Sequence, residues 1–319
     1  MDGENAPPTG LLRLLAVFAA LLLIAAAFGI RAIVDGGGDG DDGTEESGGG
    51  DDAIVLGCVT ELFQLCGALE GTDGVVEVNP GGVAEAIKND EIDAWVTFDP
   101  WPDAEDFADD GLFEEETISV AEDTLGLVLS EPYADQLGED CDNDELTRCA
   151  AEATAVDATA RLGVGDPKSA LGGVLLTAMV TEVMGSNEFD IDAVQAQAGV
   201  ITSVLNSMRH DNQLAFLLGF GSGAPVAVLS REGVADDVIT TPQGAQKDLD
   251  FVPVSPTIRV RVVMAVIPGA DRGDLENLID IETTTPKLLE QVGWDNATDQ
   301  PTGLPPGDVL LALVEQFGR

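Results

Sequence analysis

Asp99 and Trp101 are the residues whose types and spacing best suit direct contact with a charged ligand. They follow a predicted strand at residues 92–98, and an aromatic face beside a carboxylate attracts cations such as a quaternary ammonium osmolyte. The alternative is structural: Trp95 and Phe98 lie in the core and Trp101 covers an edge, because aromatic side chains usually pack. Both interpretations stay open on these residues alone.

Beyond scattered carboxylates, the chain offers no nucleophile–base pair for catalysis. His210 is the only histidine, and a solvated loop residue is its favoured interpretation. The nucleophile motif G-x-S-x-G is absent, because Phe220 and Ala224 stand at the glycine positions around Ser222. We therefore expect a protein that is not an enzyme and that uses no cofactor.

The four cysteines form two close pairs, Cys58 with Cys66 and Cys141 with Cys149. In an exported chain such pairs favour disulfides over metal, and the C-x₂-C spacing of zinc sites is missing. Three connectivities are possible, and the two local bonds are preferred. Each needs a turn inside its interval, because eight residues of continuous helix span ~12 Å. Free buried thiols are the alternative.

Residues 75–103, VVEVNPGGVAEAIKNDEIDAWVTFDPWPD, must position the candidate ligand contacts. The pattern predicts a strand, a glycine turn, a short helix and a second strand. A unit this short favours parallel pairing through a right-handed crossover. Ligands of open parallel sheets lie at the carboxyl ends of strands. The Gly81-Gly82 turn and residues 97–101 both lie at such ends.

The rest of the folded part alternates between predicted strands and helices, which indicates an α/β fold with mostly parallel sheets. Strands are expected at residues 53–57, 124–130, 162–165, 224–229 and 260–267, and helices at residues 62–69, 172–185, 192–205, 212–218, 274–281, 286–292 and 308–317.

The N-terminal residues 1–34 contain an apolar run, residues 14–30, between Arg13 and Arg31. This run spans about 25 Å as a helix, and flanking apolar residues extend it, so we predict one transmembrane helix. It is either an uncleaved anchor or a long signal peptide. The protein is then a single-pass cell-membrane protein with its folded domain on the extracytoplasmic side, or is secreted after cleavage.

Residues 35–52, rich in glycine and acidic residues, are a predicted disordered linker rather than a calcium loop, because the EF-hand spacing is absent.

The charge balance is strongly acidic, with 59 acidic against 14 basic residues and a formal net charge of −45. Such a surface repels phosphate backbones and anionic membranes, so we expect no nucleic-acid partner. Concentrated salt would screen the self-repulsion, so our hypothesis is a halophilic source. We expect a monomer.

Several stretches, in order along the chain, resemble molybdate-type periplasmic binding proteins of ABC transporters. Residues 90–103 resemble the strand and rim of that family, and residues 162–180 resemble its second-lobe strand, Gly-Asp-Pro turn and helix. Residues 124–130 match the crossing strand between them. Residues 260–272 and 288–295 resemble the return strand and the terminal helices.

The resemblance implies a two-lobed, type II periplasmic-binding-protein fold that closes over a ligand by a hinge. Lobe 1 would comprise residues 53–124 and 259–319, and lobe 2 residues 125–258. The implied function is capture of a small polar, oxyanion-like solute for a separately encoded membrane permease. A membrane-tethered sensory or interaction domain with the same fold is the alternative.

The family's ligand contacts carry over by position. They fall on Val59 and Thr60 at the tip of the first strand, on Gly81 and Gly82 in the second loop, on the second-lobe helix start at residues 170–173, and near Leu229. Most hydroxyl donors of the family are missing here.

Thr60 and Ser169 are the hydroxyl donors that remain. Backbone N–H groups at the helix starts after Gly81 and Ser169 suit an anion, because the first turn of a helix leaves N–H groups without intrahelical partners. Lys168 either helps to bind an anion or is simply exposed.

Overall fold

The computed structural model describes residues 54–69, 72, 74–139, 141–142, 145–157, 159–185, 191–207, 213–219, 224–279, 289 and 292–318. The chain divides into two units, residues 1–51 and 52–319, and the description below concerns the second. The predicted transmembrane helix, the linker and His210 lie outside the described residues. None of the helices in the described ranges has the length and apolarity that crossing a bilayer requires.

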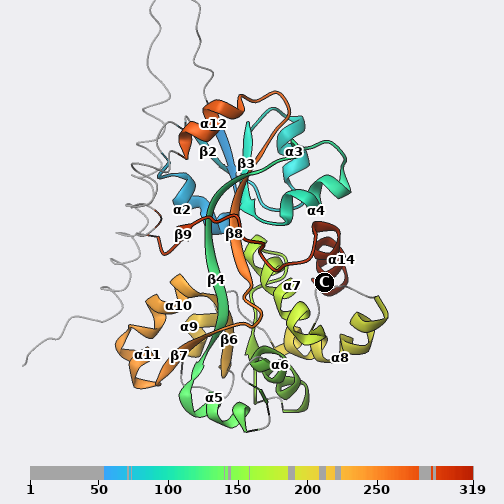
Figure 1. Cartoon of the computed structure of the whole chain (residues 1–319). Helices are drawn as coiled ribbons and strands as arrows, with labels where there is room; N and C mark the ends of the chain where they lie inside the picture. Colours follow the sequence, from blue (N-terminus) through green and yellow to red (C-terminus); the bar gives the residue numbers. More distant parts are fainter. Residues whose placement is uncertain are drawn as a thin grey trace, which may run out of the picture. The chain divides into compact units, whose positions relative to one another are not determined.

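The first half of the described unit contains strands β1 (Val55–Cys58), β2 (Gly74–Glu77) and β3 (Ala94–Phe98) (Figure 1). Its helices are η1 (Thr60–Leu62), α2 (Phe63–Cys66), α3 (Val83–Lys88), α4 (Trp101–Ala108) and α12 (Arg272–Leu278). The predicted strand–turn–helix–strand unit is therefore present as β2, α3 and β3. Both strands pair in parallel with β1, which lies between them.

The second half contains strands β5 (Leu162–Gly163), β6 (Ala227–Arg231) and β7 (Leu249–Pro253). Helices surround them: α5 (Glu131–Gly138), α6 (Leu146–Val156), α7 (Ala170–Met184), α8 (Ile191–Ser207), α9 (Gln213–Leu217), α10 (Glu232–Ile239) and α11 (Pro242–Gln246). The C-terminal helix α14 (Gly307–Phe317) packs on α4 from the first half and on α7 from the second.

Two long strands join the halves. β4 (Ile118–Ser130) pairs with β8 (Arg259–Val266) and β9 (Asp295–Asn296) through its first residues, and with β6 and β7 from Leu125 onward. At the changeover the Leu125 N–H donates to the Ile258 carbonyl at 2.9 Å, and the Val254 N–H donates to the Leu125 carbonyl at 3.0 Å. Figure 1 shows β4 and β8 running between the halves.

The expectation of mostly parallel sheets is wrong. Within the described residues the strands form one mixed sheet in the order β2-β1-β3-β8-β4-β6-β5. Parallel pairing joins β1 to β2, β1 to β3 and β5 to β6, whereas β4 and β8 are antiparallel to each other and to their other neighbours. Alternating strands and helices indicate crossovers, but they do not show that two long strands return in the opposite direction.

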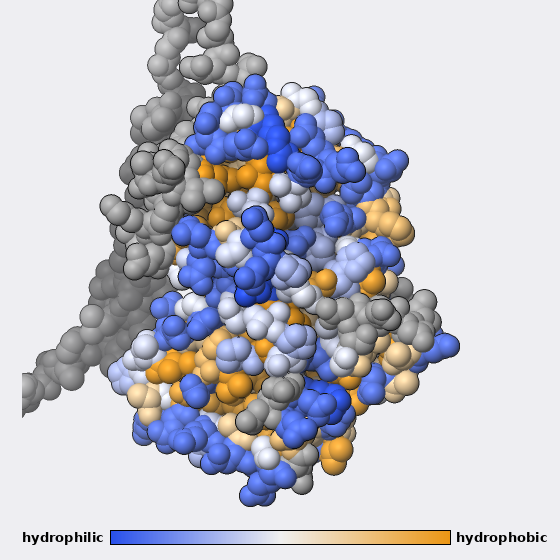
Figure 2. Space-filling view, in the orientation of Figure 1, coloured by the Kyte–Doolittle hydropathy of each residue, from blue (hydrophilic) through white to orange (hydrophobic). Residues whose placement is uncertain are grey.

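Both local disulfides are present, Cys58–Cys66 and Cys141–Cys149, each with Cα atoms 6.6 Å apart. As expected, a turn interrupts the first interval, where β1 ends and η1 begins. Among the described residues no cysteine is free. In the view of Figure 2 hydrophilic residues cover much of the visible face, interrupted by smaller hydrophobic areas, as the acidic excess leads one to expect.

Helix α7 passes through the centre of the described unit and is apolar on nearly every side. Buried residues include Gly172, Leu176 and Met179, and the helix packs against β3, β6, α6, α8 and α14. Glu182, near the C-terminal end of this apolar helix, is a buried carboxylate with only 8% of its surface exposed. Burial raises its pKa from 4.5 to about 7, because desolvation disfavours the charged form.

Replacing Gly126 by alanine is expected to lower the free energy of unfolding by about 1–3 kcal/mol. A Cβ there would lie 2.5 Å from Cζ of Phe251 and 2.6 Å from the Val252 carbonyl oxygen. Urea unfolding measures the loss, and the Phe251→Ala background should reduce it. Gly138→Ala is the matched control, since nothing lies within 4 Å of its added Cβ. Equal stability of the G126A and G138A variants would contradict the packing described.

Glu182→Gln is expected to stabilise the protein at pH 8 and to have little effect at pH 4. The folded pKa lies above the unfolded value, so the stability of the parent falls as pH rises from about 4.5 through about 7. The gain at pH 8 is up to about 3 kcal/mol, from the size of the shift. Urea unfolding across this pH range tests the difference. Glu139→Gln, an exposed carboxylate, controls for the general loss of one negative charge.

Candidate ligand-binding cavity

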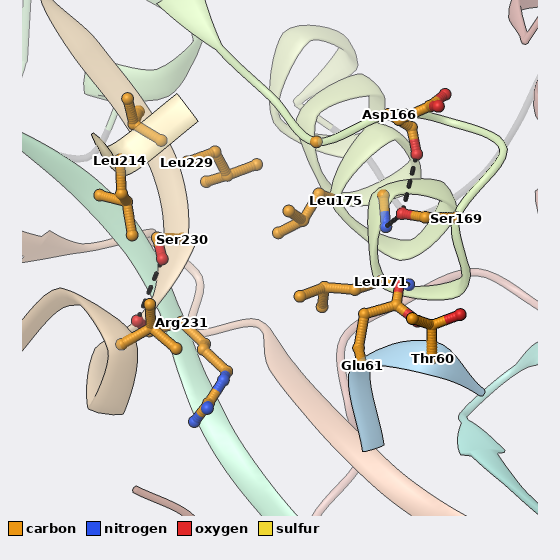
Figure 3. A pocket seen from close by; sticks show the side chains of 14 residues that line it. Thr60, Glu61, Asp166, Ser169, Leu171, Leu175, Leu214, Leu229, Ser230 and Arg231 are labelled. Carbon is orange, nitrogen blue, oxygen red and sulfur yellow. Dashed lines mark hydrogen bonds between the residues drawn. The ribbon is translucent and has the colours of Figure 1, made fainter. Parts of the chain in front are cut away.

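A cavity of about 560 Å³ lies between the two halves, and Figure 3 shows the residues around it. The first half contributes Thr60 and Glu61 from η1. The second half contributes the turn before α7, the first turns of α7, α9, the end of β6 and the start of α10. The lining residues are Thr60, Glu61, Gly165, Asp166, Ser169, Leu171, Gly172, Leu175, Leu214, Val228, Leu229, Ser230, Arg231 and Val234.

The walls of the cavity are largely aliphatic. Leu171 and Leu175 extend from α7 toward Leu214 of α9 and Leu229 of β6, which lie across the open space (Figure 3). These walls can bury hydrocarbon at roughly 25 cal/mol per Å² of apolar surface. A cavity of this size, lined by apolar groups with few polar ones, is typical of a small-molecule site.

The start of α7 is the anion site that the sequence suggested, and the chain's own groups occupy it. The Ser169 hydroxyl caps the helix, accepting from the Gly172 N–H at 3.0 Å and donating to the Asp166 carbonyl at 3.0 Å. The Leu171 N–H donates to Glu61 Oε1 at 3.1 Å. A carboxylate from η1 therefore lies where an anionic ligand would bind.

The glycine turn before α3 is occupied in the same way, and it does not line the cavity. The Gly81 N–H donates to Glu105 Oε1 at 2.7 Å, and the Gly82 N–H donates to the Asn79 carbonyl at 3.0 Å. Burial raises the pKa of Glu105, and the hydrogen bond from Gly81 opposes that rise. Gly82 lines a separate hollow of about 360 Å³ beside β2.

Thr60 lies on the cavity, but its hydroxyl is engaged by a carboxylate. The hydroxyl donates to Glu77 Oε1 at 2.7 Å, and the side-chain amide of Asn79 donates to the Thr60 oxygen at 3.0 Å. Val59, the neighbouring expected contact, is fully buried and does not line the cavity. Lys168 is exposed and lies outside the lining, although its backbone N–H donates to Asp166 Oδ1.

Asp99 and Trp101 do not line the cavity either. Trp101 is 2% exposed, and its Nε1–H donates to the Ala170 carbonyl at 2.7 Å, which joins α4 to the start of α7. Trp95 and Phe98 are fully buried, as the structural alternative required. Asp99 is half-buried, and burial and the charge of Asp103 raise its pKa, against the influence of Arg261.

Arg231 is the cationic side chain of the lining, and sequence reasoning missed it. Its guanidinium donates to Asp123 Oδ2 at 2.9 Å and to the Gly293 carbonyl, and it lies over the Trp294 ring at 4.1 Å. Burial raises the pKa of Asp123, and the contact with Arg231 opposes the rise. The arginine charge is thus paired within the protein. Arg231 follows the carboxyl end of a predicted strand, and this position could have identified it as a site residue.

Trp101→Phe is expected to lower the free energy of unfolding by about 0.5–1.5 kcal/mol, because the hydrogen bond between α4 and the Ala170 carbonyl of α7 is lost. Phe107→Leu on the same helix is the matched control, since Phe107 is 71% exposed. Chemical unfolding of both variants measures the difference. A loss below about 0.5 kcal/mol for W101F would mean that the indole does not hold the two helices together.

No protein-family model matches the chain, and no curated protein sequence is significantly similar to it. Solved structures do share its architecture. Iron-bound HitA from Pseudomonas aeruginosa is 12% identical, with a TM-score of 0.56, 84% of this chain covered and 99% of that chain. A periplasmic thiamin binding protein is 13% identical, with a TM-score of 0.51 over 86% of this chain and 97% of that chain.

A third similar structure is an ABC transporter protein from Clostridium perfringens ATCC 13124, 10% identical, with a TM-score of 0.51 over 83% of this chain and 96% of that chain. At these identities the likeness concerns the fold alone. The described unit has an α/β fold with a mixed sheet, shared with periplasmic substrate-binding proteins, and the comparison does not single out molybdate-binding ones.

Proposed function

We propose that this chain is an extracytoplasmic solute-binding domain that captures a small solute between two lobes for an ABC-type transporter. The cavity lined from both halves carries the proposal. Binding there requires no chemical change of the ligand, and among the described residues no group of three or more His, Cys, Asp or Glu could hold a metal ion. The permease would be encoded separately, and the N-terminal apolar run would tether the domain to the membrane.

The changeover in β4 supports a hinge between the lobes proposed from the sequence, residues 53–124 with 259–319 and residues 125–258. Leu125 is the first β4 residue paired with β6, and its backbone groups bond to both ends of the 254–258 connection. Small φ and ψ changes at these positions would rotate one lobe relative to the other and close the cavity.

The chemical class of the solute depends on the donors and walls that the cavity offers. An oxyanion, the class implied by the resemblance, needs free donors, and the two candidate hydroxyls donate to Glu77 and to the Asp166 carbonyl. The aliphatic walls instead support a solute with a substantial apolar part. The osmolyte site at Asp99 and Trp101 has less support, because neither residue lines the cavity.

A membrane-tethered sensory or interaction domain is the second candidate. The internal pairing of Gly81 with Glu105 favours it, since a family position for ligand contact is used here within the protein. Such a domain would bind a solute, or a partner, without passing anything to a permease. Solute uptake in cells that carry or lack the gene separates the two functions.

Leu171→Trp is expected to weaken solute binding at least tenfold, because the larger side chain would fill space inside the cavity. A thermal-shift panel of oxyanions, amino acids, sugars, amines and vitamins, run on the full chain, finds the solute. Calorimetry then compares the parent and the variant. Val156→Trp is the control, since Val156 is 91% exposed and is not one of the lining residues. A panel without any shift, or equal binding by L171W, would contradict a solute site here.

A further inference from the structure

The lining of the cavity offers few free donors to a ligand. At the start of α7 the N–H groups of Leu171, Gly172 and Gly173 donate to Glu61 Oε1, Ser169 Oγ and the Ser169 carbonyl, respectively. The Ser230 hydroxyl donates to the Arg231 carbonyl at 3.3 Å. An anionic ligand would have to displace these bonds, and the first of them belongs to a carboxylate.

The charged side chains that line the cavity differ in whether they are paired within the protein. The Arg231 guanidinium is directed away from the leucine walls in Figure 3, toward Asp123, so its charge is already balanced. Asp166 has its carboxylate on the outer side of its turn, where Oδ1 accepts from the Lys168 N–H. Glu61 is exposed, and its Oε2 accepts no hydrogen bond from any described residue. Among the described lining residues, Glu61 is therefore a carboxylate beside the apolar walls that makes no salt bridge to a cation.

We propose that the cavity selects an organic cation with an apolar body, and that Glu61 sets this charge preference. The inference rests on the proposed function, since it concerns the same cavity. The hydrocarbon part would lie between Leu171 and Leu175 on one side and Leu214 and Leu229 on the other. The ammonium group would then lie beside the free oxygen of Glu61, where the two opposite charges attract each other.

Three probes with one shared ring test the charge preference: 2-phenylethylammonium, 2-phenylethanol and phenylacetate. Their affinities for the full chain are measured by calorimetry in 0.5 M NaCl, which screens the general attraction of cations to an acidic protein. The cation is expected to bind at least tenfold more tightly than the alcohol, and the carboxylate more weakly than the alcohol.

Glu61→Gln is expected to lower the ratio of ammonium to alcohol affinity about tenfold, while alcohol affinity changes less than threefold. Glutamine keeps an acceptor for the Leu171 N–H, so the variant removes the charge and preserves the bond. Glu115→Gln, an exposed carboxylate outside the cavity, should leave both affinities unchanged. Melting temperatures within about 2 °C of the parent would establish that both variants fold.

Tighter binding of phenylacetate or molybdate than of the ammonium probe would overturn the inference, as would an unchanged ratio in E61Q. Absence of binding by all three ring probes overturns it as well. These results leave the proposed function intact if another solute in the broad panel binds and is excluded by Leu171→Trp. If no solute in the broad panel binds, the proposed solute site itself is contradicted.

Discussion

Two adjacent buried carboxylates in β4 connect this strand to arginines of two of its neighbours, β8 and β6, and the β6 arginine lines the cavity. Glu122 accepts from Arg261 at 3.3 Å and from the Thr298 hydroxyl at 2.9 Å, whereas Asp123 pairs with Arg231 on the opposite side of the strand. Both are buried, so loss of a partner would leave an unpaired charge in the interior at a cost of several kcal/mol. An acidic chain with few cations has placed three arginines here, counting Arg259 beside Glu122.

The same excess of carboxylates over cations determines which groups accept hydrogen bonds from the backbone near the cavity. Backbone N–H groups that other proteins could offer to an anion are bonded here to Glu61 and Glu105. Glutamate oxygens thus accept the hydrogen bonds that an anionic ligand would need. The described lining of the cavity is mainly hydrocarbon, and Glu61 adds a carboxylate that no described cation pairs with. The acidic composition of the chain therefore influences the chemistry of the cavity, because carboxylates are the partners of these N–H groups.

Local patterns predicted β2, α3, β3, both disulfides and the crossing strand, because turn residues and periodicity act over short distances. Sheet direction and donor partners are set by residues far apart in sequence, and no local pattern contains them. Gly81 bonds to a carboxylate 24 positions away, and Leu171 to one 110 positions away. Of the expected contact residues, Thr60, Ser169 and Leu229 line the cavity, and so do Leu171 and Gly172 of the expected helix start. Trp101 instead connects α4 to α7.

That connection between helices has an optical consequence. The chain contains three tryptophans, and Trp101 is the one whose indole N–H donates to a carbonyl in the other half of the described unit. Any movement that separates α4 from α7 would expose this ring to water, while Trp95 would stay within β3 against Phe113. The emission wavelength of the protein is thus an intrinsic signal of the separation of its halves, obtained without an attached dye.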